Sequence, residues 1–291
     1  MVRLLGGRAQ LHSIKRGCYL LALALFLAGA LKPVLYRNAR AIDYLVVFDV
    51  SLSMTTEDYV AGGAPKSRLE MAKEQFRRIL PRLPPESRIT LAGFVGARVQ
   101  VFLWSRPVQD VHAIYTALNV IRWDNVWDAG SRVDLGVEDI ARRAFGSSPP
   151  RPNLPAPLNV FFFTDGGSDS IGQRLALPGG DWLRENLRVT FVGVGRPRES
   201  PVPALTPGRA RDCLRKATGE CFTSSLNEET LRALAAMVGG RYEPLRDEDG
   251  GRLRRLFLEN PLKGAEVRVP QDVGWLFGLA SLAVFLLWIV L

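Results

Sequence analysis

Three oxygen-bearing side chains alternate directly after an apolar run in the first third of the sequence. Asp49, Ser51 and Ser53 would point the same way in an extended segment, because alternate side chains share a side of the chain. A second acidic residue, Asp165, follows another apolar run. Carboxylate and hydroxyl oxygens without histidine or cysteine form a hard ligand set. Such a set suits Mg²⁺, Mn²⁺ or Ca²⁺ and does not suit zinc or copper.

Ser131 adds a further hydroxyl, because it stands just before a helix expected over 133–145. A serine in that place is by itself more typical of a helix N-cap than of a metal ligand. The other parts of the pattern are also common singly, since Asp and Ser after a strand are ordinary turn residues. The metal site is predicted because all of these side chains occur together in one sequence pattern.

The elements that position these residues follow from the hydrophobic pattern. Strands are expected over 44–48, 89–95, 99–104, 158–163 and 187–194, with a short edge strand over 241–243. Helices are expected over 67–80, 108–121, 133–145, 228–238 and 251–258. The short link between the second and third strands makes them an antiparallel hairpin, because a parallel crossover needs about a dozen residues. The sequence thus predicts an α/β domain over 42–258, with a doubly wound, mostly parallel sheet and one antiparallel edge strand.

Such sheets place their ligand sites beyond the carboxyl ends of the strands, at the point where the strand order reverses. In the common order 3-2-1-4-5-6, the first and fourth strands flank that point. Asp49 follows the first expected strand and Asp165 the fourth. Both carboxylates are therefore expected in one crevice.

At these residues the chain resembles the von Willebrand factor A family. The metal-ion-dependent adhesion site of that family has the pattern Asp-x-Ser-x-Ser, then Thr, then Asp. The resemblance implies that Asp49, Ser51, Ser53 and Asp165 are metal ligands and that Ser131 takes the threonine position. It also implies a partner protein that donates a carboxylate to the metal, and therefore binding in place of catalysis.

Two apolar segments flank the expected domain. Within 1–36, the apolar run 18–31 follows four basic residues and fits either an uncleaved membrane anchor, which is favoured, or a cleavable signal peptide. The uncharged segment 273–291 nearly spans a hydrocarbon core of roughly 30 Å, and 259–272 is then a linker. Either N-terminal reading sends the domain across the inner membrane to the periplasm, although the positive-inside bias is slight.

The flanking segments extend the resemblance to bacterial membrane-bound members found alongside MoxR-type AAA+ ATPases. Segments 53–59 and 123–131 are similar to the members that accompany periplasmic methanol dehydrogenase. This narrower resemblance implies a role in enzyme maturation, including calcium insertion. The implied partners are an AAA+ ATPase and a periplasmic dehydrogenase.

Composition argues against other classes of protein. Part of the formal net charge of +9 lies in the basic N-terminus, and the remainder is too mild and scattered to indicate nucleic-acid binding. Cys213 and Cys221 indicate a disulfide if the domain is exported, and two free thiols if it is not.

A metal-dependent hydrolase or phosphatase is the main alternative function. A haloacid dehalogenase-type phosphatase needs a carboxylate two residues after its first aspartate, and here that residue is Ser51. A serine hydrolase needs a histidine base, and the sequence has only His12 and His112. A scaffold that has lost its metal is the third reading. The chain is predicted not to be an enzyme.

Overall fold

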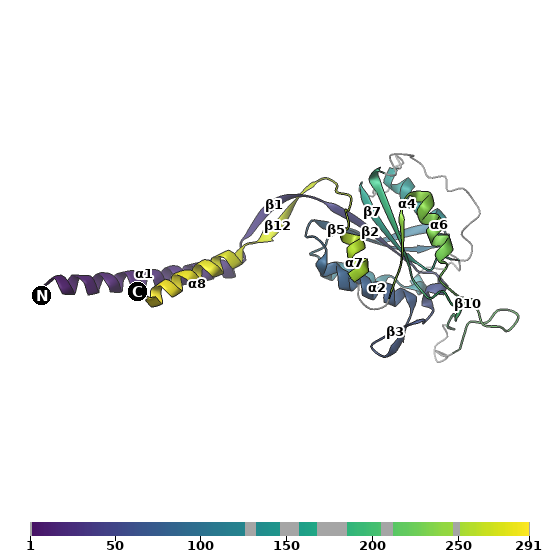
Figure 1. Ribbon diagram of the computed structural model, residues 1–291, viewed down its shortest axis with the longest axis horizontal. Coiled ribbons are helices and arrows are strands. Elements are labelled where there is room, and N and C mark those ends of the chain that lie inside the picture. The colour runs from purple at the N-terminus through teal and green to yellow at the C-terminus, as the bar shows by residue number, and fades with distance from the viewer. Residues whose placement is uncertain are drawn as a thin grey trace. The chain divides into compact units, whose positions relative to one another are not determined.

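The computed structural model describes residues 2–125, 132–145, 157–167, 185–204, 212–246 and 251–290 (Figure 1). The chain divides into two compact units. One unit is Arg40–Ala265, and the other joins Met1–Ala39 to Glu266–Leu291. Each unit has its own set of strands and helices.

A six-stranded sheet forms the centre of the larger unit, in the order β11-β8-β7-β2-β5-β6. Its strands are β2 (Ile42–Asp49), β5 (Ser87–Val95), β6 (Arg98–Pro107), β7 (Leu158–Thr164), β8 (Leu187–Gly193) and β11 (Arg241–Pro244). All neighbours pair in parallel except β5 and β6, which are antiparallel. Counted along the chain, these six strands follow the order 3-2-1-4-5-6. The predicted mostly parallel sheet with one antiparallel edge strand is confirmed.

Helices cover both faces of this sheet (Figure 1). On one face pack α2 (Arg68–Ile79), α3 (Val111–Val120) and α7 (Gly251–Leu258). On the other pack α4 (Val133–Phe145) and α6 (Glu228–Val238). Strand β2 feeds both cores, because Tyr44, Val46 and Phe48 face the first and Leu45 and Val47 the second. Burial on both faces explains why its sequence is apolar without alternation.

Local capping sets the helix ends more tightly than hydrophobic periodicity does. Ser67 caps α2 by accepting a hydrogen bond from the backbone N–H of Glu70. The helix expected from residue 108 begins only at Val111, because Asp110 accepts a hydrogen bond from the N–H of Ala113. Helix α6 ends at Val238 and is capped by Gly239, whose φ of 66° is left-handed.

Several short elements were not predicted from the sequence. Strands β3 (Tyr59–Ala61) and β4 (Ala64–Lys66) form a hairpin whose turn is Gly62-Gly63, both at positive φ. Strands β9 (Ser200–Pro201) and β10 (Thr223–Ser224) also pair, and the single-turn helices are η1 (Leu52–Thr55), η2 (Leu80–Arg82) and η3 (Trp123–Asn125). These segments are too short to show a hydrophobic period.

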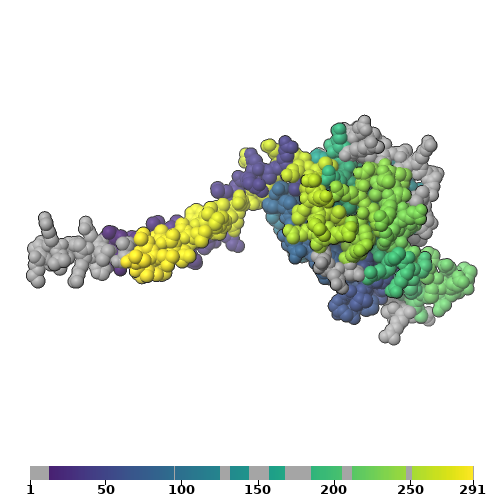
Figure 2. Space-filling view, in the orientation of Figure 1, coloured from purple at the N-terminus to yellow at the C-terminus, as the bar shows by residue number. Residues whose placement is uncertain are grey.

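The smaller unit contains a strand pair and a helix pair. Strand β1 (Val34–Arg40) pairs with β12 (Glu266–Asp272), which lies in the segment expected to be a linker. Helix α1 (Val2–Ala30) runs beside α8 (Gly274–Val290) (Figures 1 and 2). Among the described residues, only Ser13–Ala30 is long and apolar enough to cross a membrane, and α8 is a shorter apolar helix.

Contacts between α1 and α8 show that the two helices are antiparallel. The Ser281 hydroxyl, near the middle of α8, donates to the Ala22 carbonyl in the last third of α1 at 2.7 Å. Toward the strand pair, a Cβ added at Gly274 would lie 2.8 Å from the carbonyl oxygen of Gly29. Small residues therefore allow the two backbones to approach closely.

Replacing Gly274 with leucine is expected to separate α1 from α8, because the Gly29 carbonyl cannot move aside without distorting its helix. Cysteines placed at Ala22 and Ser281, in a chain with Cys18→Ser, should form a disulfide in native membranes. Gly274→Leu should abolish this cross-link. Gly278→Leu is the matched control, since a Cβ at Gly278 meets nothing within 4 Å. Equal cross-linking in both leucine variants would contradict the helix pairing.

Candidate metal centre

The two predicted carboxylates end neighbouring strands at the same edge of the sheet. Asp49 is the last residue of β2, and Asp165 follows the last residue of β7. These strands pair in parallel with Phe48 opposite Phe163, so both strands deliver their aspartates together. Asp49 is 0% exposed and Asp165 is 1% exposed. The prediction that the first and fourth strands bring these residues together is confirmed.

Both oxygens of Asp49 accept hydrogen bonds that fix its orientation. Oδ1 accepts from the backbone N–H of Ser51 at 2.9 Å, and Oδ2 accepts from the Thr164 hydroxyl at 2.6 Å. The Thr164 hydroxyl in turn accepts from the N–H of Gly166 at 3.1 Å. Sequence reasoning missed Thr164. Its position as the polar last residue of an apolar strand was the available signal.

Ser51 and Ser53 lie side by side, but not for the reason the sequence suggested. Ser51 is extended, whereas Ser53 lies inside the single-turn helix η1, so the segment curls after Ser51 instead of continuing extended. Their hydroxyl oxygens are 3.1 Å apart. Adjacent ligands of an octahedral ion with bonds of about 2.1 Å are separated by roughly 3.0 Å. The serine pair therefore fits two neighbouring coordination positions.

Ser131 lies outside the described residues. Its predicted place among the ligands is therefore neither supported nor opposed by the geometry, although α4, the helix it was expected to precede, begins at Val133 as predicted.

Arg68, which sequence reasoning also missed, places a buried positive charge beside Asp165. Its Nη1 donates to Asp165 Oδ2 at 2.9 Å, and its side chain is 0% exposed. The same guanidinium donates to Asp58. The signal in the sequence was an arginine directly after the helix-capping Ser67.

The negative charge of the buried aspartates is only partly balanced by nearby positive charge. The pKa of Asp49 is raised from 3.8 to about 6, first by burial and then by the negative charge of Asp165. Arg68 forms ion pairs with both Asp165 and Asp58, so one guanidinium balances two carboxylates. Two nearby buried carboxylates and two hydroxyls therefore fit a hard divalent cation. No group of three or more His, Cys, Asp or Glu gathers within the described ranges, so the hydroxyls are necessary to the ligand set.

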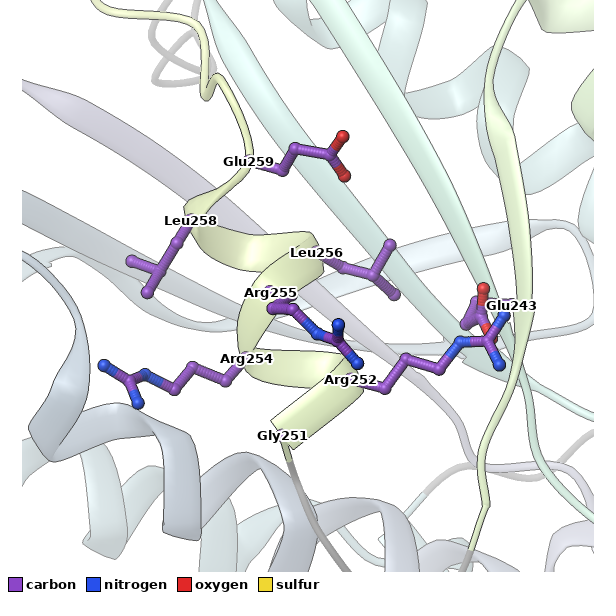
Figure 3. A pocket seen from close by; sticks show the side chains of 8 residues that line it. All are labelled: Glu243, Gly251, Arg252, Arg254, Arg255, Leu256, Leu258 and Glu259. Atoms are coloured by element: carbon purple, nitrogen blue, oxygen red, sulfur yellow. The ribbon is translucent and has the colours of Figure 1, made fainter.

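A cavity of about 930 Å³ lies at α7, away from these aspartates (Figure 3). Its lining residues are Glu243, Gly251, Arg252, Arg254, Arg255, Leu256, Leu258 and Glu259. Arg252 forms an ion pair with Glu243 across it, and Figure 3 shows Arg254 pointing to the other side of the helix. The described lining residues are arginines, glutamates, leucines and a glycine.

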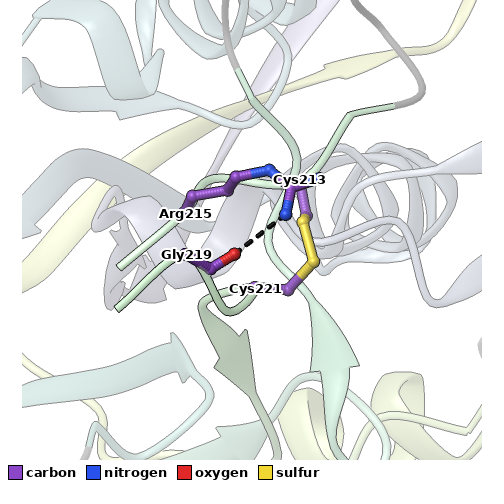
Figure 4. The surroundings of a disulfide bond; sticks show 4 residues. All are labelled: Cys213, Arg215, Gly219 and Cys221. Atoms are coloured by element: carbon purple, nitrogen blue, oxygen red, sulfur yellow. Dashed lines mark hydrogen bonds between the residues drawn. A yellow bond between two sulfur atoms is a disulfide. The ribbon is translucent and has the colours of Figure 1, made fainter. Parts of the chain in front are cut away.

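The predicted cysteine pair is bonded. Cys213 and Cys221 form a disulfide with their Cα atoms 5.5 Å apart (Figure 4). The enclosed turn is closed further by Arg215, whose Nη1 donates to the carbonyl of Gly219 at 2.8 Å. A structural disulfide is typical of domains in an oxidising compartment.

Comparisons with known proteins agree with this geometry. Residues 44–168, which include most of β2, all of β7 and both aspartates, match the model of the von Willebrand factor type A domain. Over these residues the chain is similar to the von Willebrand factor type A domain. None of the curated proteins compared with the chain has a matching sequence.

Solved structures resemble this domain at low sequence identity. BatB, a conserved hypothetical protein from Bacteroides thetaiotaomicron, has a TM-score of 0.58 and 21% identity, covering 75% of this chain and 97% of its own. An aerotolerance-related membrane protein from Bacteroides fragilis has a TM-score of 0.57 and 20% identity, covering 75% and 98% respectively. At this identity the likeness shows the von Willebrand factor type A fold.

Without metal, Asp49 should make the domain less stable as the pH rises. Its folded-state pKa of about 6 lies above the unfolded value, so folding favours the protonated acid, and that contribution is lost between about pH 4 and pH 6. Asp49→Asn should remove this dependence and raise the melting temperature at neutral pH. Thermal unfolding of the detergent-solubilised chain in EDTA measures both effects. Glu229→Gln, on the exposed first turn of α6, should leave the profile unchanged, and an Asp49→Asn profile identical to wild type would contradict the assignment.

Proposed function

We propose that this chain is a membrane-anchored binding protein whose von Willebrand factor type A domain holds a divalent metal. Asp49, Ser51, Ser53 and Asp165 supply protein ligands, and Ser131 adds a hydroxyl at the position outside the described residues. One observation carries the proposal: oxygens from the ends of two adjacent strands converge at a buried edge whose acidic charge is incompletely balanced. Mg²⁺ is the proposed ion, with Mn²⁺ or Ca²⁺ as alternatives.

The metal would serve recognition and not catalysis. The two serine hydroxyls contribute no negative charge, so the ligand set leaves the ion with unsatisfied affinity for an anionic oxygen. A carboxylate from a partner protein supplies that oxygen. Among the described residues of the site there is no histidine that could act as a general base for the serine hydroxyls. These features favour binding of a partner protein over hydrolysis of a substrate.

The membrane location is proposed for both helices of the smaller unit. Helix α1 alone satisfies the length and composition of a span. Helix α8 has no buried residue and exposes large apolar side chains along its length, which is unfavourable in water and favourable in lipid. Their antiparallel contact requires α1 to remain attached, so an uncleaved anchor is proposed in place of a signal peptide. The domain would then face the periplasm from the inner membrane, where its disulfide is stable.

The biological role is proposed as assembly or maturation of a periplasmic enzyme. The resemblance of segments 53–59 and 123–131 to proteins that accompany methanol dehydrogenase supports this proposal. A MoxR-type AAA+ ATPase and a periplasmic dehydrogenase are the proposed partners.

Metal binding is tested by its effect on stability. A ligand that binds only the folded state at one hundred times its dissociation constant adds about 2.7 kcal/mol to the free energy of unfolding. The full chain in detergent should therefore melt at a higher temperature with millimolar Mg²⁺ or Mn²⁺ than with EDTA. Ser51→Ala combined with Ser53→Ala should abolish this shift without altering the charge of the site.

Ser87→Ala is the matched control for that experiment. Ser87 is a buried serine at the start of β5, the opposite end of the sheet from the aspartates. Its variant should keep the full metal response. If no divalent cation changes the melting temperature of the wild-type chain, the metal-binding proposal is wrong and a metal-free scaffold is the better interpretation.

Topology is tested with reporter fusions. Alkaline phosphatase folds actively only outside the cytoplasm, where its disulfides form. A fusion after Gly250 should be active, and a fusion after Leu291 should be inactive, since both termini would lie in the cytoplasm. The reverse pattern would refute the proposed orientation while leaving the metal site untouched.

A further inference from the structure

Arg68 is the most completely bonded charged side chain around the proposed metal centre. We propose that Arg68 determines which divalent cation the site accepts, favouring Mg²⁺ over Ca²⁺ by restricting how Asp165 can bind a metal. This inference rests on the proposed function, because it requires the site to bind a metal. It concerns a residue that is not itself a metal ligand.

Every N–H of the Arg68 guanidinium has a partner. Nε and Nη2 donate to Asp58 Oδ2 at 2.9 and 2.8 Å. Nη1 donates to Asp165 Oδ2 and to the Ser224 hydroxyl, each at 2.9 Å, and Nη2 also donates to the Ser224 carbonyl at 3.0 Å. An arginine has five such donors in a rigid planar fork, and all five are used here. The guanidinium therefore cannot turn away without breaking several bonds.

The surrounding backbone is shaped to admit this side chain. Gly195 has a φ of +127°, and a Cβ at that position would lie 2.8 Å from Arg68 Nε. Any larger residue at 195 would push into the guanidinium. The position of Arg68 is thus enforced by a neighbouring strand end as well as by its ion pairs.

The consequence for Asp165 is a restricted set of free lone pairs. Its Oδ2 accepts from Arg68 Nη1 and from the Ser224 hydroxyl, the latter at 3.3 Å. Its Oδ1 accepts from the N–H of Gly167 at 3.2 Å. A carboxylate oxygen has two lone pairs, so Oδ2 is filled and Oδ1 retains one. Asp165 can therefore offer a metal a single oxygen.

This restriction separates the two common hard cations. Ca²⁺ takes six to eight oxygens and commonly uses both oxygens of a carboxylate, whereas Mg²⁺ takes six and readily keeps water molecules. A site that contains two serine hydroxyls and an aspartate limited to one oxygen fulfils the Mg²⁺ requirement more easily. Freeing Asp165 Oδ2 would make the second oxygen available and should benefit Ca²⁺ more than Mg²⁺.

A purely structural role for Arg68 predicts a different result. If Arg68 only holds α2 against the ends of the strands, its removal lowers stability and leaves the ratio of Mg²⁺ to Ca²⁺ affinity unchanged. The ratio therefore distinguishes the two roles, and stability does not.

The test uses the double variant Arg68→Gln with Asp58→Asn in the full chain in detergent. Removing one positive and one negative charge together keeps the net charge of the cluster constant. Isothermal titration calorimetry with Mg²⁺ and with Ca²⁺ gives the two dissociation constants. Their ratio should shift about tenfold in favour of Ca²⁺ relative to the wild-type chain. Ser224→Ala removes the other donor to Asp165 Oδ2 and should shift the ratio in the same direction by a smaller factor. It remains informative if the double variant fails to fold.

Arg88→Gln with Asp43→Asn is the matched control. Arg88 also forms a two-bond ion pair with an aspartate of β2, through Asp43 Oδ1 and Oδ2, at the opposite end of that strand. This control should lose stability and keep the wild-type ratio. An unchanged ratio in the Arg68 and Ser224 variants, or an equal shift in the control, would overturn the role of Arg68. A wild-type chain that binds neither ion would instead overturn the proposed metal site.

Discussion

Two buried carboxylates of like charge at one edge of a sheet are the constraint around which the domain is arranged. Asp49 and Asp165 lie there because β2 and β7 are adjacent and parallel, so both strands end in the same place. Burial raises the pKa of Asp49, and the negative charge of Asp165 raises it further. The Thr164 hydroxyl donates to Asp49, and the Arg68 guanidinium donates to Asp165. The metal proposed for this edge is the remaining positive charge that such an arrangement favours.

Arg68 also ties the acidic edge to segments that lie outside the sheet. Asp58 leads directly into the β3–β4 hairpin, and Ser224 belongs to β10, just after the disulfide-closed turn. The disulfide restricts that turn, and the guanidinium fixes where its end meets the sheet. The surroundings of the site are therefore held in place by covalent and ionic links in addition to apolar packing. Preorganised surroundings reduce the entropy lost on binding a partner.

The smaller unit satisfies different physical requirements. Its helices expose apolar side chains and bring together glycines and a serine at their contact, which suits a medium in which the hydrophobic effect does not drive helix association. The pairing of β1 with β12 continues the contact between the two ends of the chain. The anchor proposed for these two paired helices would require α1 to be retained, which a cleaved leader would not allow.

The sequence alone determined the order along the chain and the type of the main elements. It also identified the two aspartates of the site and the cysteine pair. Buried strands and amphipathic helices are local patterns, and the short link between the second and third strands predicted the hairpin. The strand order was expected from the common arrangement of doubly wound sheets. Asp49 and Asp165 were predictable for the same reason, since each follows a recognisable strand. The cysteine pair was predictable because only two cysteines lie outside the apolar N-terminal run.

Tertiary structure alone decided which donors surround those acids. Arg68 lies 97 residues from Asp165 in the sequence, and Thr164 lies 115 residues from Asp49, so no local pattern links either pair. The single-turn helix that brings Ser53 beside Ser51 is too short to have a periodic signal, and β1 and β12 pair from opposite ends of the chain. Local sequence patterns report on neighbours along the chain. Contacts between distant residues depend on how the elements pack, and that packing decided how the two carboxylates are balanced.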